Sequence, residues 1–125
     1  MAVPPRVLAS TTSHKREPLL PTLEIFGRLG LQDVDLNLHH ILEEGESVTG
    51  VAQAAAAHGV RVWMLSGGWC DFYGRAPEIE QTFTSVAGQV SIADALGVRY
   101  LRLFFGRLPY SDFSVAAREV ICVIV

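Results

Sequence analysis

The chain has 125 residues and a mass of 13.6 kDa, which is the size of about one domain. Hydrophobic residues make up 50% of the chain and charged residues 18%, so the sequence can bury a core and is not intrinsically disordered. The net charge of -3 excludes a strongly basic nucleic-acid-binding face. No apolar run approaches the roughly 18–20 residues that a membrane-spanning helix needs, and the first residues lack the apolar segment of a secretory signal.

The two cysteines indicate a reducing compartment. Cys70 and Cys122 lie far apart and fit no CxxC or Cys/His metal-binding spacing. We interpret them as free thiols in the cytoplasm, because disulfides are rare there. Asp71 directly follows Cys70, which argues against the lowered pKa that a catalytic cysteine needs.

In chain order, the sequence predicts alternating strands and helices. A strand at residues 7–10 comes first, and a helix follows whose apolar positions are Leu19, Leu23, Phe26 and Leu29. A second, alanine-rich helix carries Val48, Val51, Ala52 and Ala55. The longest helix opens at Pro77 and carries the apolar stripe Ile79, Phe83, Val86, Val90 and Ala93. A fourth helix is expected from Ser111 or Asp112 onward.

A glycine, an apolar residue and a strand-like run recur between these helices, at residues 30–36, 59–65 and 97–103. Glycine after the last turn of a helix adopts the left-handed conformation that ends the helix. The runs that follow are rich in aliphatic, aromatic and β-branched residues, which favour strands. The predicted order is therefore β-α-β-α-β-α-β-α.

Strands and helices that alternate at this spacing indicate parallel strands joined by helical crossovers. The fold class is α/β, and the two architectures available are an open doubly wound sheet and a (β/α)₈ barrel. The dinucleotide-binding form of the first needs a glycine-rich loop after the first strand, and residues 10–15 contain no glycine. Four βα units amount to half of a TIM barrel.

The repeat strands have one apolar and one partly polar face, because alternate residues point to opposite sides. The predicted helix-facing residues are Val34, Leu36, Trp63, Leu65, Leu101 and Leu103. The predicted inner-face residues are Asp33, Asp35, Val62, Met64, Tyr100 and Arg102. A polar inner face is where a TIM barrel builds its active site, but Asp35 and Arg102 could equally form a structural pair. A buried arginine needs such a partner.

Residues 30–36 (Gly-Leu-Gln-Asp-Val-Asp-Leu) resemble the second-strand signature of the sugar phosphate isomerase/epimerase superfamily, the xylose isomerase-like TIM barrels. Asp35 stands where that family commonly has Glu. Residues 97–106 (Gly-Val-Arg-Tyr-Leu-Arg-Leu-Phe-Phe-Gly) are similar to its fourth strand, and residues 52–66 match its third unit. The resemblance extends over most of the chain.

The resemblance implies a sugar or sugar-phosphate isomerase or epimerase, in which metal-assisted proton abstraction occurs next to a carbonyl. Complete members of the family have eight βα units, and the resemblance ends after the fourth. Their divalent metal ligands (Mn or Mg) and acid/base glutamates lie at the ends of strands five to eight. We therefore expect a single partial domain over residues 1–125, truncated, inactive in isolation and without a readable metal ligand or catalytic base.

A half barrel also suggests a different function. Its two open sheet edges and open inner face invite pairing with another chain. The apolar residues 120–125 fit an uncovered interface. The alternative function is a non-catalytic binding or assembly module that forms a homodimer through its edges, and a separate C-terminal half is the other expected partner.

Five residues of this half are candidates for the pocket of a small-molecule sugar substrate: Asp35, His39, Trp69, Phe72 and Arg102. His39 follows the second strand on the catalytic side of a barrel, although it and His40 are more simply ordinary polar loop residues. Trp69 and Phe72 belong to the aromatic loop at residues 66–74, where such side chains stack on sugar faces or cap the barrel.

Overall fold

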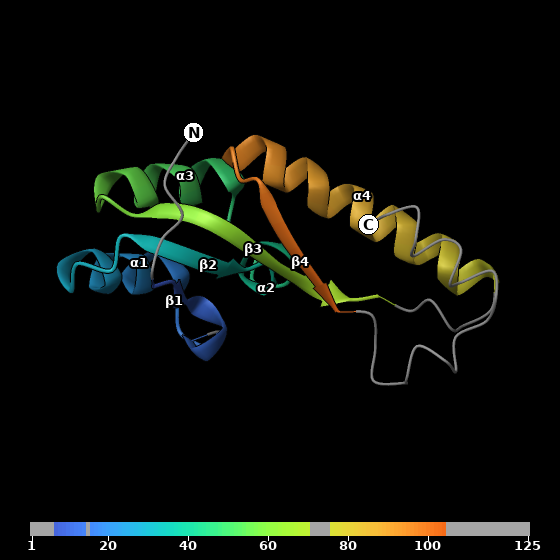
Figure 1. Ribbon diagram of the computed structural model, residues 1–125, viewed down its shortest axis with the longest axis horizontal. Coiled ribbons are helices and arrows are strands. Elements are labelled where there is room, and N and C mark those ends of the chain that lie inside the picture. Colours follow the sequence, from blue (N-terminus) through green and yellow to red (C-terminus); the bar gives the residue numbers. More distant parts are fainter. Residues whose placement is uncertain (1–6, 15, 71–75, 105–125) are drawn as a thin grey trace.

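The computed structural model describes residues 7–14, 16–70 and 76–104 (Figure 1). The elements in order are β1 (Ala9–Ser10), the 3₁₀ turn η1 (Thr11–His14), α1 (Leu19–Arg28), β2 (Asp33–Asn37), α2 (His39–Leu42), α3 (Val48–Ala57), β3 (Arg61–Trp69), α4 (Ala76–Leu96) and β4 (Tyr100–Phe104). The fourth predicted helix, from Ser111 or Asp112, lies outside the described residues. None of the helices in the described ranges combines the length and apolarity needed to span a membrane.

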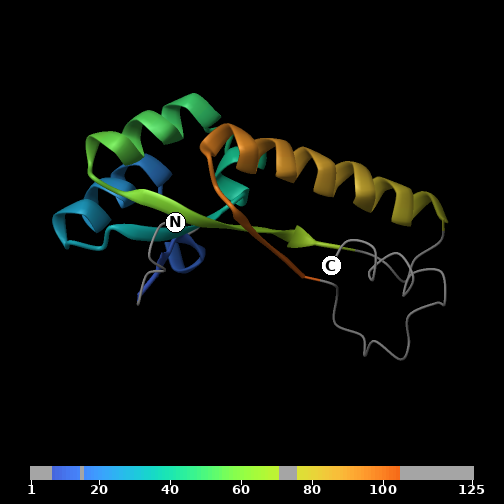
Figure 2. The ribbon, with the colours of Figure 1, turned by 45° about the horizontal axis from the view of Figure 1, so that its top comes forward.

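The four strands form one parallel sheet in the sequential order β1-β2-β3-β4. Figure 2 shows α1, α3 and α4 on one side of this sheet. Each crossover therefore adds the next strand at the same edge and lays its helix on the same face. That is the geometry of a (β/α) barrel wall, since a doubly wound sheet has helices on both faces. The predicted parallel β/α units are confirmed.

The repeated glycines end the helices as predicted. Gly30, Gly59 and Gly97 have φ angles of 75°, 66° and 67°. The amide of the apolar residue that follows each glycine donates back to the last turn of the helix, as Leu31 does to the carbonyl of Phe26 at 2.9 Å. This is the bond pattern of a Schellman motif, which requires the left-handed glycine. The glycine-apolar pair is thus the signal that turns each helix into the next strand.

The core lies between the sheet and the helices. Its fully buried aliphatic residues are Leu19, Leu23, Val34, Leu36, Val51 and Leu65. Each side chain of this size contributes about 1.5–3 kcal/mol when it leaves water. The helix-facing strand positions Val34, Leu36 and Leu65 are confirmed, whereas Leu29, predicted on the apolar stripe of α1, is exposed.

The long helix α4 exists as predicted, but its buried side differs from the predicted stripe. Phe83 and Val90 are 37% and 45% exposed, while Thr82 and Gln89 are buried; of the predicted stripe, Ala93 is buried as expected. The reason is a close approach: a Cβ on Gly67 of β3 would collide with Oε1 of Gln89. The helix therefore crosses the sheet on small and polar side chains.

The strand faces differ from the prediction at two neighbouring residues of β3, Val62 and Trp63. The β2–β3 register shifts so that Val34 pairs with Val62 and Asp35 with Met64, which leaves Trp63 as an extra residue in β3. Trp63 stacks on Tyr100 with ring centroids 5.8 Å apart, and Val62 packs against the core. The predictions of Trp63 toward the helices and Val62 on the inner face are therefore wrong. Because of the bulge, the side chains of Val62 and Trp63 point to the opposite faces of the sheet from those predicted.

Two segments that the sequence predicted as loops have regular structure. His39 and His40 begin the short helix α2, and β3 continues through Ser66 and Gly67 to Trp69. A second register shift, between Ser66 and Trp69, accommodates this extension of β3 beside β4. Both segments lie at the carboxyl end of the sheet, where the polar residues gather.

Candidate functional site

Asp35 is the centre of a polar network on the face of the sheet opposite α1, α3 and α4, which we call the inner face. Ser10 Oγ donates to Oδ2 of Asp35 at 3.0 Å, and Ser66 Oγ donates to Oδ1 at 2.5 Å. Arg102 Nη2 donates to Oδ2 at 3.1 Å and to Ser66 Oγ at 2.7 Å. We call these four residues the Asp35 network. One carboxylate thereby joins side chains from β1, β2, β3 and β4.

Burial explains why the carboxylate gathers so many donors. Asp35 is 3% exposed, and an unpaired carboxylate at such a position would be costly. Charge-assisted bonds from a guanidinium and two hydroxyls replace the water it loses. Arg102 has a partner, as expected, and that partner is Asp35; the buried charge of the pair is Asp35, however, since Arg102 is half-exposed.

The pairing with Asp35 does not use all the hydrogen-bond donors of Arg102. Its side chain is 43% exposed. Within the described ranges, its side-chain hydrogen bonds to Asp35 and Ser66 both come from Nη2. A guanidinium carries five N–H donors, so those of Nε and Nη1 are not used by these two bonds. The ring of Phe104 lies 5.2 Å from the guanidinium carbon and flanks it.

A second polar cluster lies on α2, directly after β2. His40 is 0% exposed, and its Nδ1 lies 2.7 Å from Oε2 of Glu44. Its Nε2 has no hydrogen-bond partner among the described residues. His39 lies 2.9 Å from Glu43 through Nδ1 and 3.5 Å from Glu44 through Nε2. Glu44 is thus shared by the two histidines.

The prediction that His40 is an ordinary polar loop residue is wrong, because its side chain is fully buried. Sequence reasoning missed it although a signal exists. Glu44 follows His40 at the spacing at which side chains meet on one side of a helix. Leu38 and Ile41 flank the histidine with apolar residues, and both pack into the core region.

Thr11 and Asn37 fix the position of this cluster relative to β1. The amide of Asn37 donates to Thr11 Oγ1 at 2.8 Å, and Asn37 Oδ1 accepts from the amide of His39 at 2.9 Å. The turn after β1 therefore holds the end of β2 and the start of α2. Sequence reasoning missed both residues, which carry no distinctive pattern.

The structure brings only some of the predicted site residues together. Asp35 and Arg102 share the network, whereas the side chain of His39 contacts Glu43 and Glu44, which directly follow α2. Trp69 ends β3 and pairs with Phe104 of β4. Phe72 lies outside the described residues. The predicted aromatic wall of the pocket stays a prediction.

The described residues do not fit a metal site. The family that the sequence resembles holds a divalent ion, but in residues 7–14, 16–70 and 76–104 no three His, Cys, Asp or Glu side chains converge to hold one. The carboxylate of Asp35 is instead saturated by hydroxyl and guanidinium donors. The inner face described here is therefore built for hydrogen bonding.

Cys70 follows β3 and is buried and free. Its amide donates to the carbonyl of Phe104 at 2.6 Å, which continues the pairing of β3 with β4. Burial raises the pKa of its thiol. A reactive thiolate needs the opposite shift, so a nucleophilic role for Cys70 is disfavoured.

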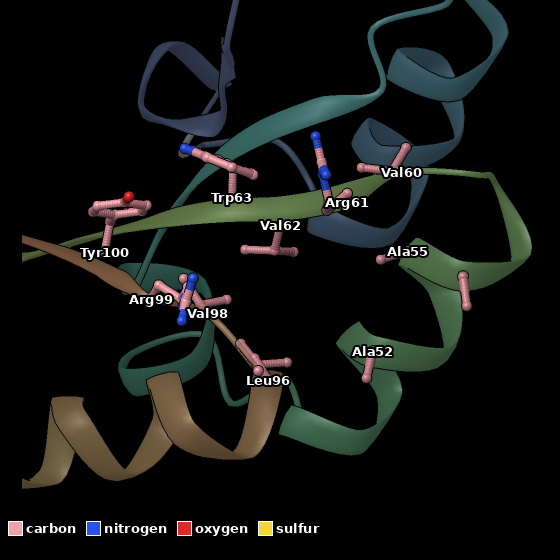
Figure 3. A pocket seen from close by; sticks show the side chains of 12 residues that line it. Ala52, Ala55, Val60, Arg61, Val62, Trp63, Leu96, Val98, Arg99 and Tyr100 are labelled. Carbon is pink, nitrogen blue, oxygen red and sulfur yellow. The ribbon is translucent and has the colours of Figure 1, made fainter. Parts of the chain in front are cut away.

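A pocket of about 430 Å³ has no residue of the Asp35 network in its lining. It opens between α3, α4 and the amino-terminal ends of β3 and β4, on the helix-bearing face (Figure 3). A TIM barrel carries its chemistry at the carboxyl ends of the strands, so this pocket is separate from the candidate site.

No family model matches the sequence, and no curated protein matches it. Solved structures resemble the fold, and two of them superimpose as follows. A xylose isomerase-like TIM barrel/4-hydroxyphenylpyruvate dioxygenase fusion protein superimposes with a TM-score of 0.60 and 16% identity over 69% of this chain and 14% of that chain. The probable 3-DHS dehydratase AsbF from Bacillus anthracis, involved in petrobactin synthesis, superimposes with a TM-score of 0.67 and 17% identity over 94% of this chain.

The fold is part of a TIM barrel. The chain spans 46% of AsbF and 14% of the fusion protein, which agrees with the sequential four-stranded sheet and confirms the predicted partial barrel. In such a barrel, the face that carries the Asp35 network is the inner wall, and α2 lies at the carboxyl ends of the strands. Likeness at this identity establishes the fold, and the reaction is argued separately.

Proposed function

We propose that this chain forms the first four βα units of a barrel that isomerises or epimerises a sugar or sugar phosphate. The observation that carries this proposal is the Asp35 network, a polar assembly on the inner wall to which all four strands contribute. An inner wall that served only as core would be filled with aliphatic side chains. Here a half-exposed guanidinium is held in place instead.

Each of the five candidate residues has a role in this proposal. Arg102 binds a hydroxyl or phosphate oxygen of the substrate, because its free N–H groups match such acceptors. Asp35 positions Arg102. His39 contacts substrate at the end of β2, and Trp69 and Phe72 stack on the sugar ring.

In this proposal, proton abstraction next to the carbonyl requires the complete barrel. By resemblance, the base and the Mn or Mg ligands come from strands five to eight, and the isolated chain is proposed to be inactive. The described residues supply binding and orientation. We propose the cytoplasm as its compartment, since the described cysteine is free.

A second function is favoured by the strand order. The sheet leaves β1 and β4 as edges, and β4 exposes two aromatic residues, Tyr100 and Phe104. Parallel edges of this kind pair with other chains. The alternative proposal is a non-catalytic assembly module that forms a homodimer.

Ligand-observed NMR on the 125-residue chain separates these proposals. Fructose 6-phosphate and fructose should both show saturation transfer from the protein, more strongly for the phosphate. Arg102→Gln should abolish the difference, whereas the matched variant Arg28→Gln, on the exposed end of α1, should retain it. If Arg102→Gln and Arg28→Gln showed the same difference in saturation transfer between fructose 6-phosphate and fructose, the proposed role of Arg102 would be contradicted.

Light scattering tests the assembly module, with and without Mn²⁺. A stable dimer that binds neither sugar supports the alternative function. Deuterium incorporation next to the carbonyl, measured by NMR in D₂O, would show catalysis and overturn the proposed inactivity of the chain.

A further inference from the structure

The pocket between α3 and α4 has an apolar lining. Its walls are the side chains of Ala52, Ala55, Val60, Val62, Leu96 and Val98. Figure 3 shows these side chains around one space, with Trp63 and Tyr100 on the other side of the strands. The alanines of α3 create that space, because larger side chains would fill it to the usual density of a protein interior.

An unpaired cation borders this apolar space. Arg99 lines the pocket, is exposed, and has neither an ion pair nor a side-chain hydrogen bond in the described part of the chain. Arg61, which also lines it, is engaged by Asp33 at 2.6 Å and lies over the ring of Trp63. Arg99 is therefore the group at this pocket that would favour a negatively charged ligand. A guanidinium prefers a carboxylate, which can accept two parallel N–H bonds.

We propose that this pocket binds a medium-length straight-chain fatty acid, with the alkyl chain among the aliphatic side chains and the carboxylate at Arg99. A volume of about 430 Å³ matches a small ligand of this kind. Flexible alkyl chains follow an irregular aliphatic wall better than rigid rings do. The site lies on the helix-bearing side of the sheet, so it is independent of the proposed sugar pocket.

Titration calorimetry with straight-chain carboxylates tests the apolar part of the site. Affinity should rise about fourfold for each methylene from hexanoate to decanoate, and should level off when the pocket is full. Affinity that does not change with chain length would overturn the proposal.

Charge recognition is tested with one variant and two ligands. Arg99→Gln should weaken octanoate binding by about two- to fivefold, as expected for an exposed ion pair, and leave octan-1-ol binding unchanged. Arg28→Gln, which changes an exposed arginine on α1, is the matched control and should leave both unchanged. If Arg99→Gln and Arg28→Gln changed the affinity for octanoate equally, the proposed role of Arg99 would be overturned.

A filling variant locates the ligand. Ala56 lines the pocket but is exposed on α3, so Ala56→Leu should fold and should block octanoate. Gln53→Leu, also exposed on α3 but outside the lining, is the control and should bind normally. Titration calorimetry should detect octanoate binding only where the pocket is open. A dimer that closes the pocket and excludes octanoate would identify a second copy as the occupant and overturn the proposal.

Discussion

Asp35 and Arg102 lie 67 residues apart in the sequence, and their side chains meet at 3.1 Å between Oδ2 and Nη2. The contact reaches from β2 to β4 across β3, whose Ser66 bonds to both partners. The buried carboxylate and the half-exposed guanidinium therefore hold the inner wall together as one polar unit. We expect the removal of either charge to lower the stability of the whole sheet.

Arg102→Met tests this dependence. The variant leaves the buried carboxylate of Asp35 with only hydroxyl donors, and we expect the free energy of unfolding to fall by about 1–3 kcal/mol. Arg99→Met removes an arginine without an ion pair in the described residues and should change stability by less than about 0.5 kcal/mol. Urea denaturation measures both. Equal losses would show that the charge of Arg102 does not support Asp35.

Gly27 should be intolerant of a side chain. A Cβ at this position of α1 would collide with the carbonyl oxygen of His58, the C-cap residue of α3. Gly27→Ala should therefore force the two helices apart and cost about 1–3 kcal/mol. Gly88→Ala is the matched control: nothing lies near its Cβ, and alanine should stabilise α4 by about 0.5–1 kcal/mol. Thermal denaturation should move the two melting temperatures in opposite directions.

Glu44 and Glu43 should differ in their effect on stability. Glu44→Ala leaves Nδ1 of the buried His40 without its partner, and should cost about 1–3 kcal/mol. Among the described residues, Glu43 pairs only with the partly exposed His39, so Glu43→Ala should cost less than about 1 kcal/mol. Denaturant unfolding of the two variants at the same pH gives the comparison. Equal losses of stability in Glu44→Ala and Glu43→Ala would contradict the role of Glu44 as the partner of the buried His40.

Cys70 should react slowly in the folded chain. Its pKa is raised by burial, so alkylation by iodoacetamide should need a higher pH in the native state than in urea. The same shift makes the folded state retain a proton that the unfolded state releases. Stability contributed by this group is present below the pKa of the unfolded thiol, about 8.5, and is lost as pH rises toward the folded pKa.

Mass spectrometry of the Cys122→Ala variant follows Cys70 alone. The pH dependence of unfolding above about pH 8.5 should flatten when Cys70→Ala is added. An alkylation rate that is the same in native and unfolded protein would contradict the burial of this thiol.

Local patterns made the order of elements predictable. The glycine-apolar pair encodes a helix end and a strand start within a few residues, which is why the strands after Gly30, Gly59 and Gly97 were located correctly. The pairing of Asp35 with Arg102 was also predictable, since both lie on the polar face of their strands and a buried charge needs a partner.

Features that depend on two strands at once could not be read from the sequence. The bulge at Trp63 arises from the pairing of β3 with β2, and nothing in the run from Arg61 to Leu65 marks the extra residue. Ser10 and Ser66 are ordinary serines until the sheet brings both hydroxyls to one carboxylate. Burial of His40 likewise depends on where α2 packs after β2.

Sequential strand order has a consequence for how this sheet comes apart. A wall in which each strand pairs only with its neighbours behaves as a one-dimensional array, and such arrays fray from their ends one unit at a time. The bond between Asp35 and Arg102 skips one strand, and the hydroxyl of Ser10 extends it to the opposite edge. Loss of either terminal strand therefore disturbs a carboxylate in the middle. We therefore expect the network to make the four strands unfold together instead of one at a time.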